Sequence, residues 1–377
     1  MRVAILTNIP APYRTALFDG IAALPDVELR VFFGRETEPR RDWTEEEATG
    51  YEREYGKGLS LPKGEGQLSV VDHSLYRRLS RFAPDVVVAT GLLDAAIAAL
   101  YCQYAGAGLV LWSDATADTD PRGHISLAVY RALVRRADAF VASSTRARDY
   151  FVELGAPKTG IGVSLISPGD AWCAPGVSRR QGRESLGLTG PTVLYAGQLI
   201  HRKGIDLLCG TFRLVAEMVP SAQLLVVGSG ADQSDLVHLR EVLAPGAVVL
   251  RDAVPYAQLP AIYSAADVFA LLTRRDAYSV VVAEAVLASL PVLVSERAGA
   301  AADLVANGSN GYRVDPEDTV GNADLLARML CDEELRNGMA EVSKAVATRL
   351  TSAAIVNDFA GAIRAAADSA CLRGGFQ

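Results

Sequence analysis

Short apolar runs rich in valine and isoleucine alternate along the chain with longer segments of helical periodicity. In the first half these runs are VAILT (3–7), ELRVFF (28–33), DVVVAT (85–90), GLVLW (108–112), AFVAS (139–143) and IGVSLI (161–166). Helical patterns cover 13–23, 92–105, 124–136 and 144–154. Strands that are apolar throughout and separated by helices predict a parallel sheet with helices on both faces.

The alternation stops near 175–190, where PGVSRRQGRESLGLTGP has a composition typical of a linker. It restarts with strand-like runs at 192–197, 222–228, 247–250, 267–272, 291–295 and 311–314, and from about 318 an Ala-rich helical pattern continues to the end. The sequence therefore predicts an α/β protein of two Rossmann-like parallel-sheet domains, residues 1–182 and 190–350. We expect a C-terminal helix, 351–377, to pack back on the first domain. Ligands bind beyond the carboxyl ends of such strands, so a central cleft faced by both domains is the expected site.

One stretch, residues 35–68, interrupts the alternation because it is long, charged and weakly periodic. It is typical of a surface loop or hairpin. Long loops are also often functional, so a loop that contacts an acceptor at the edge of the cleft is the alternative.

The composition of the chain argues against several classes of function. Half of the 377 residues are hydrophobic and the net charge is -7, with no basic excess in either half, which argues against nucleic-acid binding. Five scattered cysteines without a CxxC favour neither a zinc site nor a disulfide framework. The opening MRVAILTNIPAPYR is typical of a strand rather than a signal peptide, and no apolar run is long enough to span a membrane.

These observations predict a cytoplasmic protein. Two basic clusters, YRRLSR (76–81) and RALVRR (131–136), have two interpretations. They are either solvated helix faces or contacts to an anionic surface, which would place the protein peripherally on the inner membrane face.

A candidate anion site lies in YAGQLIHRKGIDLL (195–208), where a strand, a loop and a helix follow one another. Arg202 and Lys203 stand just before a helix that begins near Gly204. The helix dipole disfavours cations there, so their placement suits an anion held between them and the free N–H groups. We expect phosphate binding, with a solvated basic turn as the alternative.

The stretch RRDAYSVVVAEAVLA carries two carboxylates, Asp276 in a loop and Glu284 near the second turn of the helix that follows. The helix would start at Ser279–Val280, with its unpaired N–H groups at the same edge. Carboxylates accept hydrogen bonds from vicinal hydroxyls, so this pair suits a sugar or ribose, unless the two acids are unrelated.

Candidate residues in the first domain follow its strands: Tyr13, Arg14, Trp112, Asp114 and His124, which we expect at the edge of the cleft. Asp118 and Asp120 form a D-x-D, but that pattern is frequent by chance, and we expect no metal there or elsewhere. No GxGxxG follows the first strand, and the P-loop, GxSxG and HExxH motifs are missing from the sequence.

Taken together, GQLIHRKG and DAYSVVVAE resemble the donor-binding segments of retaining GT-B glycosyltransferases of family 4, also called glycosyl transferases group 1. Lys203 matches the family lysine that binds the donor diphosphate, and Asp276 and Glu284 match the E-x7-E pair. Gln198 replaces the usual arginine and Asp276 the usual glutamate, so donor preference is expected to differ at these two positions. Ser113–Asp114 stand where the family has a histidine.

The resemblance implies a hexosyltransferase that moves a sugar from a nucleotide-diphosphate donor, UDP-linked by default, to a hydroxyl acceptor, with retention of configuration and without a metal or other cofactor. The acceptor is a glycan, a lipid-linked sugar or a secondary metabolite. Arg202, Lys203 and Asp276 would act in catalysis. Glu284 would bind the ribose and the Ala277–Val280 backbone the sugar and phosphates. The donor set implied is Gly197, Gln198, Arg202, Lys203, Arg251, Asp276, Ala277, Tyr278, Ser279, Val280 and Glu284.

Two other classes stay open at this point. One is a GT-B sugar-nucleotide epimerase or phosphorylase. The other is a non-catalytic protein that binds a sugar nucleotide.

Overall fold

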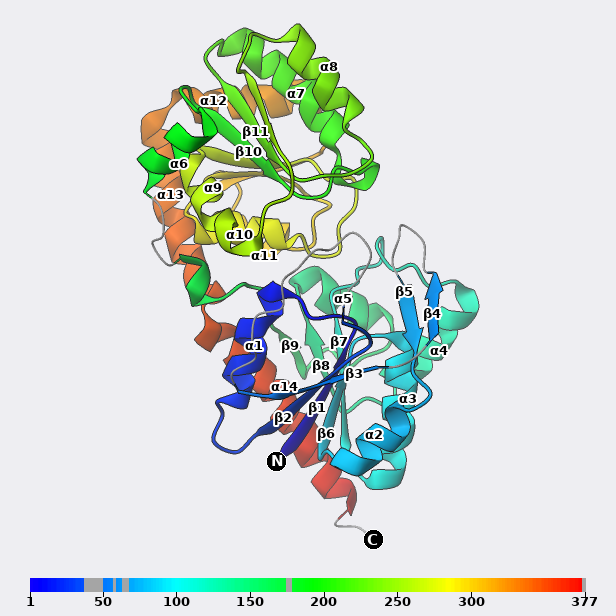
Figure 1. Ribbon diagram of the computed structural model, residues 1–377. Coiled ribbons are helices and arrows are strands. Elements are labelled where there is room, and N and C mark those ends of the chain that lie inside the picture. Colours follow the sequence, from blue (N-terminus) through cyan, green and yellow to red (C-terminus); the bar gives the residue numbers. More distant parts are fainter. Residues whose placement is uncertain (37–49, 57–58, 63–67, 174–177, 375–377) are drawn as a thin grey trace. The chain divides into compact units, whose positions relative to one another are not determined.

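The computed structural model describes residues 1–36, 50–56, 59–62, 68–173 and 178–374 (Figure 1). The chain forms two compact domains. The first combines Met1–Gly169 with Ser352–Gln377, and the second is Asp170–Thr351. The division thus falls before the expected boundary at 182, and the C-terminal segment belongs to the first domain.

The first domain is built on a seven-stranded parallel sheet of order β3-β2-β1-β6-β7-β8-β9. Its strands are β1 (Arg2–Thr7), β2 (Glu28–Phe33), β3 (Glu52–Tyr55), β6 (Val86–Ala89), β7 (Gly108–Ser113), β8 (Ala139–Ala142) and β9 (Ile161–Val163). Its helices are α1 (Pro12–Ala22), α2 (Leu75–Phe82), α3 (Leu92–Ala105), α4 (His124–Val134), α5 (Thr145–Glu153) and α14 (Ser352–Gly374). The order is that of a Rossmann-like sheet with one added edge strand, and the parallel sheet itself was predicted by the alternating pattern.

Each face of this sheet buries its own apolar core. Helices α2, α3, α4 and α5 pack on one face, and α1 and α14 pack on the other. Figure 1 shows α14, in red, lying along the sheet. Phe359 of α14 is fully buried against Trp112 of β7, so the C-terminal helix is part of the first domain's core.

The second domain repeats the plan with a six-stranded parallel sheet of order β12-β11-β10-β13-β14-β15. Its strands are β10 (Thr192–Ala196), β11 (Gln223–Val227), β12 (Val248–Arg251), β13 (Val268–Leu271), β14 (Val292–Ser295) and β15 (Gly311–Val314). Its α-helices are α6 (Arg179–Leu186), α7 (Ile205–Met218), α8 (Ser234–Val242), α9 (Leu259–Ala265), α10 (Val280–Leu287), α11 (Ala301–Leu304), α12 (Thr319–Cys331) and α13 (Glu333–Ala347). The 3-10 turns are η1 (Asp170–Cys173), η2 (His201–Lys203), η3 (Tyr256–Gln258) and η4 (Thr348–Leu350).

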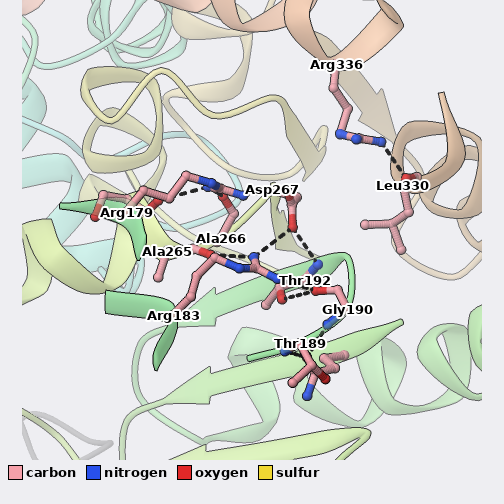
Figure 2. Close-up of polar contacts among 12 residues, drawn as sticks. Arg179, Arg183, Thr189, Gly190, Thr192, Ala265, Ala266, Asp267, Leu330 and Arg336 are labelled. Atoms are coloured by element: carbon pink, nitrogen blue, oxygen red, sulfur yellow. Dashed lines mark hydrogen bonds and ion pairs between the residues drawn. The ribbon is translucent and has the colours of Figure 1, made fainter. Parts of the chain in front are cut away.

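The stretch predicted as a linker contains helix α6, which is anchored to the second sheet. Ser178 caps the helix with a capping box. Arg179 Nη2 lies 2.6 Å from Asp267 Oδ1 and Arg183 Nη1 lies 3.2 Å from Asp267 Oδ2 (Figure 2). Asp267 also accepts a hydrogen bond from the Thr192 N–H. The arginines that suggested a solvated linker are therefore anchors, so the linker prediction is wrong for residues 179–186.

Part of the charged stretch 35–68 is regular structure. Residues Glu52–Tyr55 form β3, a parallel edge strand beside β2, where a loop or hairpin was expected. An antiparallel pair, β4 (Leu59–Pro62) and β5 (Leu68–Val71), follows, which agrees with the expected hairpin. The remaining parts of this stretch, 37–49, 57–58 and 63–67, lie outside the described residues. Among the described residues, no helix combines the length and apolarity needed to cross a bilayer.

Candidate functional site

Two loops of the second domain meet where the adjacent strands β10 and β13 end. The Arg274 N–H and the Thr273 hydroxyl both donate to the Arg202 carbonyl oxygen, at 2.9 Å and 2.8 Å. Gly204 has φ +67, and a Cβ there would lie 1.9 Å from the Leu272 carbonyl oxygen. Only glycine allows this approach, so the loops are held together by backbone contacts.

A bidentate ion pair joins the same two segments. Arg274 Nη1 and Nη2 lie 2.7 Å and 2.5 Å from the two carboxylate oxygens of Asp206, in the first turn of α7. These hydrogen bonds hold the pKa of Asp206 below its ordinary value. The pair orients the start of α7 relative to the loop that carries Asp276.

The charged centre of the site is formed by Lys203, Arg202 and Asp276. Lys203 Nζ forms an ion pair with Asp276, and Arg202 Nη1 lies 3.8 Å from Asp276 Oδ1. Asp276 is 8% exposed. Burial by itself would raise the pKa of Asp276, but Lys203 and then Arg202 outweigh it and keep the carboxyl ionised. The structure therefore brings together the three residues that the sequence assigned to catalysis.

Helix α10 begins directly after this centre. Its N-cap, Ser279, has φ +73, a left-handed conformation that is rare for a residue with a side chain, and no side chain caps the helix. The buried Ser279 hydroxyl lowers the pKa of nearby Asp276, yet its geometry falls short of a hydrogen bond. The N–H groups of the first turn of α10 thus have no capping side chain. Two cations, Arg202 and Lys203, lie beside them.

The backbone of the Ala277 region is fixed by the loop after β14. The Gly299 N–H donates to the Asp276 carbonyl oxygen at 3.0 Å, and the Ala300 N–H donates to the Tyr278 carbonyl oxygen at 2.8 Å. A Cβ on Gly299 would lie 1.7 Å from the Ala277 carbonyl oxygen. Gly299 is therefore needed for the conformation of the loop, and Tyr278, which is 2% exposed, packs inward.

Glu284 projects from the second turn of α10 into an aromatic environment. Its side chain accepts a hydrogen bond from the Tyr263 hydroxyl at 2.7 Å and another from the Tyr256 hydroxyl at 3.3 Å. Burial raises the pKa of Glu284 to about 7, although both hydrogen bonds oppose the shift. Glu284 therefore exchanges a proton near neutral pH.

The residues that hold Glu284 could not be identified from the sequence. Tyr256 and Tyr263 precede Glu284 by 28 and 21 positions and have no motif of their own. Trp172 of η1 lies over both, with ring centroids 5.0 Å from Tyr256 and 5.6 Å from Tyr263. Only the fold brings these aromatic rings to the carboxylate.

The raised pKa of Glu284 makes stability depend on pH. The folded state binds this proton more tightly than the unfolded state does, so the contribution to stability falls as pH rises from about 4.5 to about 7. Glu284→Gln removes this dependence. As pH rises from about 5.5 to about 8.5, the parent is expected to lose about 2 kcal/mol of unfolding free energy that Glu284→Gln retains.

Denaturant unfolding at both pH values measures this change. Glu217→Gln is the matched control, because the Glu217 side chain is 63% exposed in α7. The buried-carboxylate assignment fails if Glu284→Gln and Glu217→Gln show the same pH dependence.

The other residues assigned to the donor lie at the same edge of the sheet. Gly197 follows β10, and its N–H donates to the Val227 carbonyl oxygen at 3.0 Å. Gln198 is exposed, and its carbonyl oxygen accepts from the Tyr195 hydroxyl at 2.8 Å. Arg251 is exposed at the end of β12. These three residues stay candidates for donor contact.

In the first domain the structure brings together three of the five predicted cleft residues. Tyr13, Arg14 and Trp112 line a cavity of about 10 Å³, room for about one water. The Arg14 guanidinium lies 4.6 Å from the Trp112 ring centroid and donates to the Thr7 hydroxyl. Trp112 is 3% exposed, and it contributes to the wall of this cavity.

The other two cleft candidates lie outside this cavity. Asp114 is partly exposed just after β7, and His124 is exposed as the first residue of α4. They remain candidates for acceptor contact.

The D-x-D of the first domain is engaged by protein groups. Asp118 accepts from the Thr116 hydroxyl at 2.6 Å and from Arg146 at 3.0 Å. Asp120 accepts from the Tyr150 hydroxyl at 2.6 Å and pairs with Arg122. Across the described parts of the chain, no three His, Cys, Asp or Glu side chains gather in a metal-binding arrangement.

The second domain and the fold each resemble known proteins. Residues 178–346 match the family Glycosyl transferases group 1, which takes in nearly all of the second domain. HepE from Anabaena, solved in complex with UDP and glucose, superposes with a TM-score of 0.75 at 19% identity over 96% of this chain and 98% of its own. The protein therefore has the GT-B fold, and its second domain is similar to the glycosyl transferases group 1.

Curated relatives share part of this length. The chain is 31% identical over 232 residues to the D-inositol 3-phosphate glycosyltransferase of Xylanimonas cellulosilytica, spanning 58% of this chain and 54% of that protein. It is 30% identical over 225 residues to the GDP-mannose-dependent alpha-(1-6)-phosphatidylinositol monomannoside mannosyltransferase of Mycolicibacterium smegmatis, spanning 54% and 58%. The match thus spans just over half the length of these relatives.

Proposed function

We propose that the protein is a retaining glycosyltransferase that moves a hexose from a nucleotide-diphosphate sugar to a hydroxyl acceptor. The observation that carries this proposal is the cluster of Lys203, Arg202 and Asp276 beside the start of α10, with Glu284 one to two turns further. Cations and helix N–H groups suit a diphosphate, and the two carboxylates suit hydroxyls. The family of the second domain and the named activities of its relatives support the same reaction.

In this proposal the diphosphate takes Lys203 away from Asp276. The Lys203 ammonium, Arg202 and the α10 N–H groups then stabilise the negative charge that the leaving diphosphate gains as its bond to the sugar breaks. Freed from Lys203, Asp276 accepts hydrogen bonds from sugar hydroxyls, and Glu284 binds the ribose. The protein supplies the cations, so the proposed reaction needs no metal.

Retention and the donor base follow from the family resemblance. The acceptor hydroxyl attacks from the side that the leaving group occupies, and the leaving phosphate takes its proton. UDP is the proposed nucleotide, with GDP as the first alternative because one relative is GDP-mannose-dependent. The proposed residues for acceptor contact are Tyr13, Arg14, Trp112, Asp114 and His124.

A thermal-shift screen of UDP-, GDP- and dTDP-sugars tests donor binding. A sugar nucleotide at about 100 times its Kd is expected to stabilise the protein by about 2.7 kcal/mol. Mass spectrometry of the reaction with hydroxyl acceptors then detects the glycosylated product, and NMR of its anomeric proton reports retention. Free epimerised sugar nucleotide or dependence on phosphate would identify an epimerase or phosphorylase instead. If no nucleotide raises the melting temperature, the site assignment is wrong.

A further inference from the structure

Three neighbouring helices of the first domain share one outer surface. Helices α2, α3 and α4 pack on the same face of the sheet and contribute to one buried core. Helix α3 contacts both of the others, and the Tyr76 and Tyr101 rings of α2 and α3 lie 6.1 Å apart. Their outward sides therefore form one continuous surface of the first domain (Figure 1).

Helix α4 is apolar on its solvent side as well as on its buried side. Tyr130, Leu133 and Val134 face the core. On the outside, Ile125 is 84% exposed and Val129 is 46% exposed, with Ala128 and Ala132 also exposed. The spacing i, i+3, i+4, i+7 makes these four residues one helical stripe. A helix that is covered only by water would carry polar side chains at these positions.

Helix α3 continues the apolar stripe beside α4. Leu93 is 42% exposed, Leu100 48% and Tyr104 74%, and these positions also recur at helical spacing. We define the α3–α4 face by its exposed apolar and basic residues, which are Leu93, Leu100, Tyr104, Ile125, Val129, Arg131, Arg135 and Arg136. Contiguous exposed apolar side chains mark a contact surface rather than an ordinary solvated one.

The charge of these three helices is opposite to that of the whole chain. The net charge of the protein is -7, yet α2, α3 and α4 contain a single acid, Asp94, among their residues. The exposed arginines of these helices and of the residues directly after α4 are Arg77, Arg81, Arg131, Arg135 and Arg136. Within the described residues, none of these five has an ion-pair partner.

The arginines also gather at one end of the surface. Helices α3 and α4 each follow a parallel strand, so both run back from the carboxyl edge of the sheet to its amino edge. Arg131, Arg135 and Arg136 stand at the end of α4, where Tyr104 ends the stripe of α3. An apolar stripe with an aromatic ring and long cationic side chains beside it has the composition of an interfacial contact.

We propose that the α3–α4 face binds an anionic lipid surface. The apolar side chains would enter the headgroup region while the arginines contact lipid phosphates. The excess of unpaired arginine over acid favours a uniformly negative partner over a protein surface of mixed charge. This interaction is separate from glycosyl transfer, so its test does not depend on the proposed donor site.

Co-sedimentation with vesicles tests the proposal on the full chain. Vesicles of phosphatidylcholine with about 30% phosphatidylglycerol should bind the protein, and vesicles of phosphatidylcholine alone should bind it weakly. Replacing Arg131, Arg135 and Arg136 together with glutamine should lower the partition coefficient on the order of 100-fold. The double variant Ile125→Ser/Val129→Ser should also release the protein, and salt at about 0.5 M should weaken binding by the parent.

Helix α8 of the second domain provides the matched control. Val237 is 49% exposed there and Arg240 is exposed, but Asp235 and Glu241 lie beside them. Val237→Ser/Arg240→Gln should leave vesicle binding unchanged. An equal loss of vesicle binding in this control overturns the proposal. Failure of the parent protein to bind anionic vesicles at low salt also overturns it. Ile125→Ser/Val129→Ser altering the oligomeric state without altering vesicle binding would instead identify a protein interface and also overturn it.

Discussion

Replacing Lys203 with alanine is expected to lower kcat/KM for sugar transfer about 100-fold, the equivalent of 2–3 kcal/mol for a lost charged hydrogen bond. The ammonium group is the cation closest to Asp276 and stands where the proposed diphosphate would bind. Its loss removes stabilisation that grows as the leaving group gains charge, so kcat should fall together with kcat/KM. Steady-state kinetics with the donor identified by the screen measures the effect. Lys344→Ala is the control, because Lys344 pairs with Glu341 on the surface.

A second variant separates phosphate binding from loss of the ion pair. Asp276→Asn keeps the shape of the side chain but removes the charge that holds Lys203. If Lys203 binds the diphosphate, Asp276→Asn should bind free UDP at least as tightly as the parent, while Lys203→Ala binds it more weakly. Equal weakening in both variants would show that the pair is only structural.

Phe359→Ala is expected to destabilise the first domain by 3–5 kcal/mol, the usual range for deleting a buried phenylalanine ring. Phe359 is fully buried, and its ring centroid lies 5.0 Å from that of Trp112 in an edge-to-face contact. The substitution removes both this contact and apolar packing between α14 and the sheet. Denaturant unfolding followed by the tryptophan fluorescence of the first domain measures the change.

Leu372→Ala is the matched control on the same helix. Leu372 is 69% exposed near the end of α14, so its truncation should change stability by no more than about 0.5 kcal/mol. A destabilisation by Phe359→Ala below about 1 kcal/mol would mean that α14 adds little to the first domain's core.

The alternation of apolar strands and helices was enough to predict both sheets. Strands that are buried on both faces of a parallel sheet need apolar side chains at every position, so runs such as 192–197 are visible without other information. The charged stretch containing β3 gave no such signal, because an edge strand is half-buried and tolerates Glu52 and Arg53. Helix α6 was missed because its polar composition is typical of a linker, whereas its arginines reach Asp267, just before β13.

The properties of the candidate site also divide into those that the sequence determined and those that only the tertiary structure decided. The sequence by itself determined that Lys203 and Asp276 each come after a strand and that Glu284 lies in the helix after Asp276, since strand ends and helix starts follow from local pattern. Only the tertiary structure decided that Lys203 pairs with Asp276, that Tyr256 and Tyr263 hold Glu284, and that burial raises the pKa of Glu284 to about 7. These properties depend on side chains far apart in the chain and on the exclusion of water, which a local pattern of residues does not encode.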